Sequence, residues 1–239
     1  MKKTNQSIFN KMGLFLAPLI YKILNVLSDI NILIGKLIAS TYKFTWPYIG
    51  TSWFDHRFDY LRGPENIFWL ERVIYTNNLI HQGDLILDIG CGDGIYSGKF
   101  YSSIAKFVDA IDLDLKAINH AKKTYPQKNV KFSKKNIVNW TPTKKYNGIF
   151  MFAVIEHLTK KDGQKVLSKI GKSLAKGGVF FGSTSVFEDR GFHNFEHENE
   201  FASVVILKKF LSQKFKSVKI TTSNWPGRLE CYFECRQPR

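Results

Sequence analysis

A glycine-rich run with two carboxylates is the part of the sequence best suited to hold a ligand. Residues 88–94 read Asp-Ile-Gly-Cys-Gly-Asp-Gly and follow the apolar run 85–87, which predicts a strand buried on both faces. Glycines at alternate positions permit a tight turn and let a ligand lie against bare backbone. A helix expected to begin near Ile95 would present free N–H groups to that ligand. The pattern predicts a site for a nucleoside-like molecule.

A second acid supports this prediction and narrows the ligand. The expected strand 107–112 ends at Asp112, about 20 residues after the glycines, where a carboxylate can accept both ribose hydroxyls. A dinucleotide site would need the spacing G-x-G-x-x-G, whereas this chain has G-x-G-x-G. Asp88 and Asp93 would repel a pyrophosphate and attract an ammonium or sulfonium group. These charges favour S-adenosylmethionine over a dinucleotide.

With these motifs, residues 83–184 resemble the class I S-adenosylmethionine-dependent methyltransferases. The resemblance implies that Asp88 and Gly90 hold the methionine end, that Gly92 and Gly94 shape the turn, and that Asp112 binds the ribose. Asn136 stands where an acid usually contacts adenine, and its amide can both donate and accept. The full set of cofactor-binding residues expected from the resemblance is Asp88, Ile89, Gly90, Cys91, Gly92, Gly94, Asp112, Leu113, Asn136, Ile137 and Phe152.

The family also implies the fold, an α/β Rossmann-like doubly wound sheet. Seven strands are expected, mostly parallel with an antiparallel last strand, in a domain spanning 64–239. A helix is expected from Pro64 to about Leu79, with Val73 and Ile74 on its buried side. The third strand and the adenine-contacting turn are expected within 130–137, the fourth strand at 146–152, and a glycine turn with the fifth strand within 174–181. The last two strands are expected at 217–222 and 230–235, and a further helix at 204–211. Asn147 in the fourth strand stands where the family often has an aspartate.

The acceptor side is indicated by histidines. The segment Glu156-His157-Leu158 resembles the ubiquinone-pathway O-methyltransferases, in which an extra acid precedes the pair; that position is Ala153 here, so no metal site is expected. His157 could act as a general base, or Glu156 and His157 could order the loop over the methionine tail. His193 and His197 are further acceptor-site candidates, with a capping or surface role as the alternative. Their H-x-x-E-H spacing matches a zinc-protease motif, but Gly191 and a polar run indicate a loop.

Other methyl acceptors are tested by motifs. Base-amine methylation is disfavoured because the motif N/D-P-P-Y/F is replaced by Phe-Ala-Val-Ile at 152–155, and base-carbon methylation because no cysteine is suitably placed. Ribose or tRNA methylation stays open, since residues 115–155 hold nine lysines and no acid. The alternative for such a run is a solvated surface.

Residues 1–63 form a separate segment. Apolar residues recur at helical spacing from Ile8 to Ile38, with Lys11, Lys22, Asn25, Asp29 and Lys36 opposite them, and Pro18 predicts a kink or two helices. The charges disfavour a secretion signal and a membrane-spanning helix. Residues 1–40 could instead lie in an anionic membrane face, or pack on the protein's own core or in a dimer. The aromatic stretch 41–63, with Arg57 and Arg62, is expected to be a connector or lid.

Composition sets the limits of these interpretations. The 239 residues carry a net charge of +15, which suits nucleic acid, an anionic membrane or an acidic substrate alike. Three cysteines are too few for a disulfide framework and favour the cytoplasm. The leading hypothesis is a methyltransferase for a small or lipid-linked acceptor, with O-methylation expected, peripheral on the inner membrane face. The alternatives are an RNA-directed methyltransferase and a non-catalytic cofactor-binding protein.

Overall fold

The computed structural model describes residues 2–51, 53–59, 68–186, 197–225 and 228–239. They form two compact units. The first contains residues up to 51 together with 55–69, and the second contains 52–54 together with 70–239. The sequence placed the boundary between 63 and 64, within a stretch outside the described residues, whereas the units divide after Trp69.

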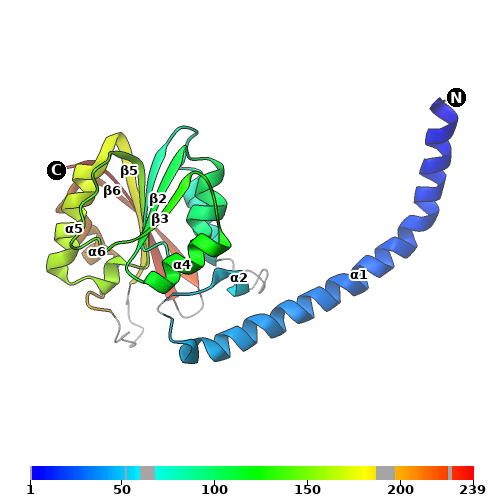
Figure 1. Ribbon diagram of the computed structural model, residues 1–239, viewed down its shortest axis with the longest axis horizontal. Helices are drawn as coiled ribbons and strands as arrows, with labels where there is room; N and C mark the ends of the chain where they lie inside the picture. The colour runs from blue at the N-terminus through cyan, green and yellow to red at the C-terminus, as the bar shows by residue number, and fades with distance from the viewer. Residues whose placement is uncertain (1, 52, 60–67, 187–196, 226–227) are drawn as a thin grey trace. The chain divides into compact units, whose positions relative to one another are not determined.

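A single seven-stranded sheet forms the centre of the second unit (Figure 1). Its strand order is β3-β2-β1-β4-β5-β7-β6, and every pairing from β3 to β5 is parallel. β7 runs antiparallel to both of its neighbours. The predicted doubly wound sheet with an antiparallel last strand is therefore confirmed. The strands are β1 (Leu85–Ile89), β2 (Phe107–Asp112), β3 (Val130–Lys134), β4 (Tyr146–Phe152), β5 (Leu174–Val186), β6 (Phe215–Trp225) and β7 (Arg228–Pro238).

The helices of this unit pack against the sheet and begin at capped positions. Figure 1 shows α5 (Lys160–Ser173) near α6 (Val204–Ser212), and Gln164 Nε2 of α5 donates to Phe210 O of α6 at 3.0 Å. At the other end of the sheet, α4 (Leu115–Thr124) packs beside β2 and β3. Asp114 and Thr159 accept hydrogen bonds from backbone N–H groups in the first turns of α4 and α5, which fixes where those helices start.

Apolar side chains of the central strands fill the core. Leu87, Ile149, Phe180 and Phe233 are fully buried and belong to one cluster that extends to α5 and α6. Such continuous burial is expected of strands covered on both faces. The core fixes the strands, and the parallel pairing brings the carboxyl ends of β1, β2, β4 and β5 to one edge of the sheet.

Helix α3 (Phe68–Asn77) buries a different side from the one predicted. Val73 is buried as expected, but Ile74 is exposed, and Arg72 and Thr76 are buried in its place. Helical spacing places Arg72, Val73 and Thr76 on one side of the helix. The sequence interpretation named only apolar residues on the buried side, so a buried arginine was missed.

The first unit is dominated by α1 (Lys2–Ile49), one curved helix that continues through Pro18 (Figure 1). The sequence predicted a kink or two helices, and the structure has a single bent one. The helix also includes Tyr42, Phe44 and Trp46, which the sequence assigned to a connector. After it, the short helix α2 (His56–Asp59) folds back within the same unit. Tyr42 stacks on Phe58 with ring centroids 4.5 Å apart.

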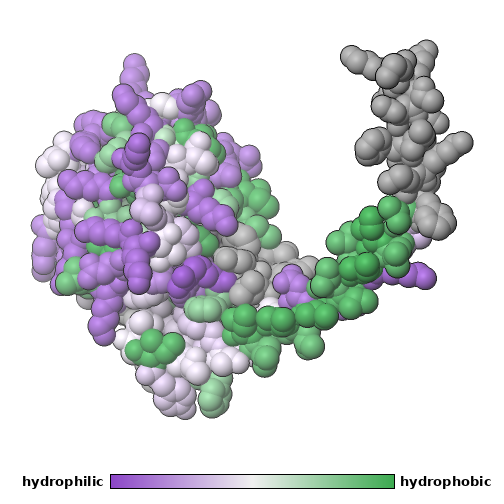
Figure 2. All heavy atoms as spheres, turned by 45° about the vertical axis from the view of Figure 1, so that its right-hand side comes forward, coloured by the Kyte–Doolittle hydropathy of each residue, from purple (hydrophilic) through white to green (hydrophobic). Residues whose placement is uncertain are grey.

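The described side chains of α1 are more apolar than the predicted one-sided stripe. Exposed residues such as Leu27 and Leu33 lie on the stripe, but Ile20, Leu24 and Ile32 are exposed apolar residues outside it. Figure 2 shows apolar side chains along the described part of this helix. By length and composition, the helix over 16–49 contains a stretch apolar enough to cross a membrane. On these two measures the charges therefore do not rule out a spanning helix, and a soluble core helix or a signal sequence would pass the same test.

Candidate functional site

The glycine run forms the turn predicted after β1. Gly90, Gly92 and Gly94 have φ angles of +74°, +51° and +81°, a region in which side chains with a Cβ are strained. The N–H groups of Gly90 and Cys91 donate to Ile111 O of β2 at 2.8 and 3.0 Å. The turn is thus tied to the neighbouring strand, and its conformation requires glycine.

Close packing adds a second requirement for glycine. A Cβ on Gly90 would lie 2.2 Å from Cγ2 of Val154, which follows β4. A Cβ on Gly94 would lie 2.5 Å from Cβ of Ala121 in α4. These contacts draw the loop after β4 and the helix after β2 against the turn. The glycines therefore serve the fold of the site as well as the approach of a ligand.

Asp112 is held ready at the end of β2. Its Oδ2 accepts a hydrogen bond from Gly92 N–H at 2.9 Å, and its Oδ1 accepts one from Asp114 N–H at 2.8 Å. Burial raises the pKa of this carboxyl, and the backbone donors counteract that shift. Each oxygen retains further acceptor capacity. The carboxylate is pre-oriented to receive hydroxyl groups, as the ribose prediction requires.

Asp88 lies at the end of β1 and is almost fully buried. Ser97 Oγ donates to its Oδ2 at 2.5 Å. Burial, reinforced by the negative charge of Asp112, raises the pKa of Asp88 to about 7. A buried carboxylate in this state gains most from a cationic ligand. The site thus fits a nucleoside with a positive amino group better than an anion.

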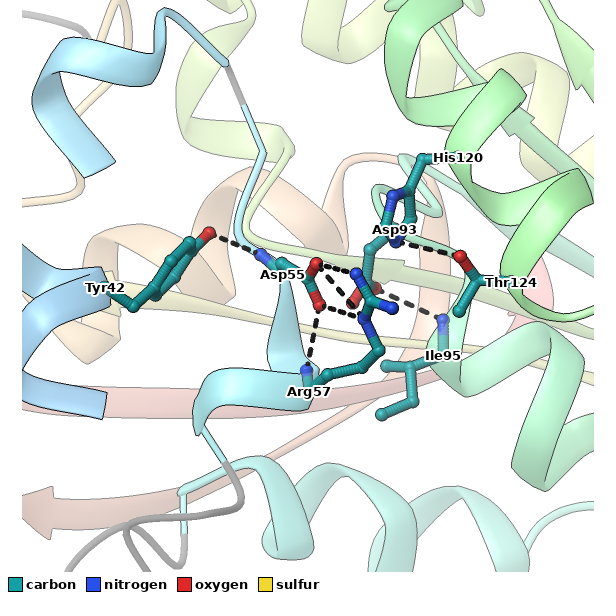
Figure 3. Close-up of polar contacts among 7 residues, drawn as sticks. All are labelled: Tyr42, Asp55, Arg57, Asp93, Ile95, His120 and Thr124. Carbon is teal, nitrogen blue, oxygen red and sulfur yellow. Dashed lines mark hydrogen bonds and ion pairs between the residues drawn. The ribbon is translucent and has the colours of Figure 1, made fainter. Parts of the chain in front are cut away.

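The helix after the turn begins at Ile95 as predicted, but it is not a regular α-helix. Residues Tyr96–Phe100 form a π-helical turn, which a 3₁₀ turn at Tyr101–Ser103 follows. The buried carboxylate of Asp93 accepts a hydrogen bond from Ile95 N–H at 3.2 Å (Figure 3). Such π-helical turns often occur at functional sites. Nothing in the spacing of apolar residues signals this change of helix type.

Trp53 is a site residue that the sequence interpretation left in the connector. Its ring lies 4.6 Å from that of His120 between centroids. A Cβ on Gly92 would lie 3.9 Å from Cβ of Trp53, so the Trp53 side chain starts next to the glycine turn. His120 in turn lies 3.2 Å from Thr124 Oγ1 (Figure 3). The aromatic character of the connector was a signal, but spacing could not select this tryptophan.

The connector arginines are only partly described. Within the first unit, Asp55 N–H donates to Tyr42 Oη at 2.8 Å, and Arg57 pairs with the Asp55 carboxylate at 2.6 Å (Figure 3). Arg57 thus has a local structural partner. Arg62, the other candidate for closing over a ligand, lies outside the described residues.

The remaining cofactor candidates differ in accessibility. Leu113 is exposed beside Asp112, as a side chain that a ligand would cover. Asn136 Oδ1 accepts from Val138 N–H at 2.9 Å, so its oxygen already caps a local turn. The other candidates are buried, and two of them, Ile89 and Ile137, belong to the apolar core. This buried group consists of Ile89, Cys91, Ile137 and Phe152.

The structure brings three of the four acceptor-side candidates together. Glu156 and His157 form a 3₁₀ turn after β4, and His197 lies in the segment after β5. The two imidazole rings are 5.0 Å apart between centroids and nearly perpendicular. Glu156 is buried, which raises its pKa, and the negative charge of Glu230 adds to the shift. His193, the fourth candidate, lies outside the described residues.

A buried polar group beside these residues was missed from the sequence. The guanidinium of Arg72 lies 3.7 Å from Glu230 Oε1 and 5.2 Å from the centroid of the Phe152 ring. Ser183 donates to the same Glu230 oxygen. Periodicity places such residues on a face but cannot show that strands distant in sequence enclose them, so only an unexpected charge in β7 could have signalled it.

The sheet order, the glycine turn and the placed Asp112 define a class I S-adenosylmethionine-dependent methyltransferase domain, the class of protein that uses this cofactor as methyl donor. Residues 86–178 match a family described as methyltransferase domain. The chain is also 31% identical over 142 residues to malonyl-[acyl-carrier protein] O-methyltransferase 2 of Ilyobacter polytropus, covering 55% of this chain and 54% of the relative. The chain thus spans about half the length of that curated relative.

Solved structures share the fold. The N-methyltransferase NodS of Bradyrhizobium japonicum, in complex with S-adenosyl-L-homocysteine, superposes with a TM-score of 0.62 at 17% identity, covering 82% of this chain and 99% of NodS. The magnesium protoporphyrin IX methyltransferase ChlM of Synechocystis, also with S-adenosyl-L-homocysteine bound, gives a TM-score of 0.58 at 16% identity, covering 86% and 98%. At these identities the likeness concerns the fold.

Proposed function

We propose that this protein transfers a methyl group from S-adenosylmethionine to an oxygen of a small or lipid-linked acceptor. The observation that carries the proposal is the pre-oriented Asp112 beside the glycine turn, since Gly92 N–H fixes its Oδ2 at 2.9 Å. S-adenosylmethionine supplies an activated methyl group on a sulfonium centre. The protein's task is then to bind, to align and to exclude water.

The chain's own residues divide this task. Asp112 would accept the ribose hydroxyls, and ionised Asp88 would attract the ammonium end. The glycines let the backbone approach the ligand. Leu113 and Trp53 offer apolar surface beside Asp112 and Gly92 respectively. Buried Phe152, at the end of β4, lines the same edge of the sheet, and the cation of Arg72 lies against its ring.

On the acceptor side, a hydroxyl must lose its proton for an oxygen to attack. His157 and His197 offer two imidazoles, the side chain most often used for such proton transfer, at the carboxyl edge of the sheet where ligands of open α/β folds bind. The O-methyltransferase from Ilyobacter gives this oxygen assignment its support from sequence. Because the match covers only about half of that relative, its acceptor is not carried over to this protein. The acceptor class proposed here rests on the site.

A membrane face is the proposed place of action. The helix α1 offers a long apolar surface within its described residues from Leu16 to Ile49. Apolar helices with lysines nearby bind anionic bilayers through burial of apolar side chains and through attraction between the lysines and the lipid headgroups. A lipid-linked acceptor would be concentrated at the same surface. We therefore favour lipid-linked acceptors over freely soluble ones.

RNA is the second candidate, and the structure offers it less. Of the nine lysines in residues 115–155, Lys144 pairs with Asp109 at 2.8 Å and lies over the Phe107 ring. Lys135 lies 3.9 Å from the centroid of the Trp140 ring. These lysines stabilise the fold locally. One reason for a non-catalytic role was Asn147, which stands where the family often has an aspartate. Its Oδ1 accepts a hydrogen bond from Leu85 N–H at 2.9 Å, so this asparagine has a structural role at the start of β1.

Transfer of a labelled methyl group would test the proposal. Full-length protein is incubated with methyl-labelled S-adenosylmethionine and separate lipid, small-molecule and RNA extracts. Label is expected in the lipid fraction and lost with Asp112→Ala. Label only in RNA would replace the proposal by the second candidate. Cofactor binding without label in any fraction would favour the non-catalytic alternative.

A further inference from the structure

Three side chains of metal-ligand type meet at the carboxyl edge of the sheet. Ligand atoms of Glu156, His157 and His197 all lie within 4.8 Å of one another, in a group that could hold a metal ion. The geometry points to a transition-metal site here, with Zn²⁺ or Co²⁺ bound by one carboxylate and two imidazoles. This inference adds a metal-binding site to the proposed methyl transfer. Binding of the ion can be measured without any methyl transfer.

The backbone holds the two ligand-bearing segments together. Asn199 N–H donates to Glu156 O at 2.9 Å, which joins the segment carrying His197 to the turn carrying the other two ligands. Next to it, Phe201 forms an isolated parallel bridge with Val186 at the end of β5 and is buried. The turn itself is closed by a hydrogen bond from His157 N–H to Val154 O at 3.0 Å. The ligands are thus brought together by the fold, before any ion binds.

The carboxylate of Glu156 provides independent evidence that a cation belongs here. Its residue is only 2% exposed, and its Oε2 has no hydrogen-bond partner among the described residues. A buried carboxylate oxygen without a partner is costly unless a cation or donor compensates it. The nearby cation Arg72 already contacts Glu230 and the Phe152 ring. A metal ion at Oε2 would supply the missing compensation.

His197 has a carboxylate beside one of its ring nitrogens, as metal-bound histidines commonly do. Its Nδ1 lies 3.5 Å from Glu200 Oε1. A carboxylate on one ring nitrogen orients the imidazole and makes the other nitrogen a better ligand. Nε2 of His197 is then the atom to bind the ion.

The ligand set selects the ion. Two histidines and one glutamate are a known catalytic zinc set, which leaves an open fourth position, whereas Mg²⁺ and Ca²⁺ prefer oxygen ligands. Ligand atoms on one zinc ion lie about 3.3–3.5 Å apart, so the side chains must close by up to about 1.5 Å from the present spacing of 4.8 Å or less. His157 is on the solvent side. When the ion is bound, both imidazoles are its ligands, so an acceptor oxygen at the open position would lose its proton through polarisation by the ion rather than to a free imidazole.

Metal titration of the full-length, chelator-treated protein tests the inference. Calorimetry with Zn²⁺, and visible absorption with Co²⁺, should reveal one ion per chain with a low-symmetry, nitrogen- and oxygen-ligated spectrum. Glu156→Gln, His157→Ala and His197→Ala should each weaken binding by about 100-fold or more, and Glu200→Gln by about tenfold. His81→Ala is the matched control, since His81 is an exposed histidine in the turn before β1 and should leave binding unchanged.

Each variant is also titrated with S-adenosyl-L-homocysteine and melted thermally, so that loss of the fold is told apart from loss of a ligand. If Glu156→Gln fails to fold, the two histidine variants decide the question. No metal binding by the wild-type protein would overturn the inference, as would equal binding by both histidine variants. These readouts do not depend on methyl transfer, so failure of the proposed function would leave them intact.

Discussion

Ser97 Oγ donates a 2.5 Å hydrogen bond to Oδ2 of Asp88, and this contact opposes the burial that raises the carboxyl's pKa to about 7. Serine and aspartate come from the π-helical turn and the end of β1, on the two sides of the glycine turn. The charge of this buried carboxylate is thus set by two neighbouring elements. Its ionisation can be followed by experiment.

Cofactor binding should depend on pH through Asp88. The ammonium end of S-adenosylmethionine favours the ionised carboxylate, so affinity should rise by up to about tenfold per pH unit from about pH 5 and level off near pH 7. Calorimetry across this range measures the slope. Ser97→Ala removes a hydrogen bond that lowers the pKa and should move the plateau to higher pH. Asp88→Asn should weaken binding and abolish the slope; an unchanged slope in that variant would refute the assignment.

The same carboxyl should affect stability without cofactor. Its pKa is higher in the folded protein than the ordinary value of 3.8, so the folded state holds the proton more tightly. The contribution of this carboxyl to the free energy of unfolding is therefore greatest below about pH 4. It falls by up to about 4 kcal/mol as the pH rises toward 7. Denaturant unfolding of wild type and Asp88→Asn at both ends of this range isolates the effect. A wild-type curve parallel to that of the variant would contradict it.

Gly90→Ala and Gly177→Ala form a matched pair that separates strain from crowding. Both glycines have positive φ, +74° and +78°, but a Cβ meets Val154 at 2.2 Å only at Gly90 and has no atom within 4 Å at Gly177. The backbone strain should lower the free energy of unfolding by about 1–2 kcal/mol in both variants. In Gly90→Ala, the overlap with Val154 should lower it by about a further 1–3 kcal/mol. Thermal unfolding compares the two.

Cofactor binding by this pair gives the second readout. Gly177 lies in the first part of β5. The Gly177→Ala variant should bind S-adenosylmethionine as the wild type does. Gly90→Ala should lose most of its affinity, because the loop after β4 must shift away from the turn. Equal stability and equal affinity in the two variants would show that the close approach of Val154 is unimportant.

The sequence was sufficient where a local pattern has one structural solution. β2, β4 and the glycine turn were predicted with their observed limits, because an apolar run that ends in an acid or in glycines has few alternatives. Buried polar groups were not predictable in this way. Arg72 and Glu230 belong to α3 and β7, and only the folded sheet makes them neighbours.

The histidine cluster shows the same limit at the site. Glu156 and His157 were found from an adjacent pair, and His197 from a separate motif, but sequence could not join them. The Asn199–Glu156 backbone hydrogen bond that does so depends on tertiary folding. Sequence patterns also underestimated α1, since a stripe was sought and the apolar side chains outside it were discounted.

Loss of Arg72 should destabilise the fold strongly. The guanidinium and Glu230 are both buried, and removing one member leaves the other charge unpaired at a cost of about 3–5 kcal/mol. Arg236→Met is the control, because its pair with Glu234 is partly exposed and should cost less than about 1 kcal/mol. Urea unfolding of Arg72→Met and Arg236→Met measures both. Similar values for the two would mean that Arg72 and Glu230 do not act as a buried pair.

The apolar surface of α1 should bind membranes mainly through hydrophobic contact. In the full chain, Leu27→Glu combined with Ile34→Glu changes two exposed side chains seven residues apart, which helical geometry places on one face. Losing two buried aliphatic groups costs at least about 3 kcal/mol, so partition into phosphatidylglycerol-containing vesicles should fall by about 100-fold or more. Lys22→Gln with Lys36→Gln removes about 1 kcal/mol per charge and should have a smaller effect that high salt mimics. Flotation of both double variants beside wild type gives the comparison, and a wild-type protein that does not float would remove the membrane face from the proposed function while leaving the methyltransferase site untouched.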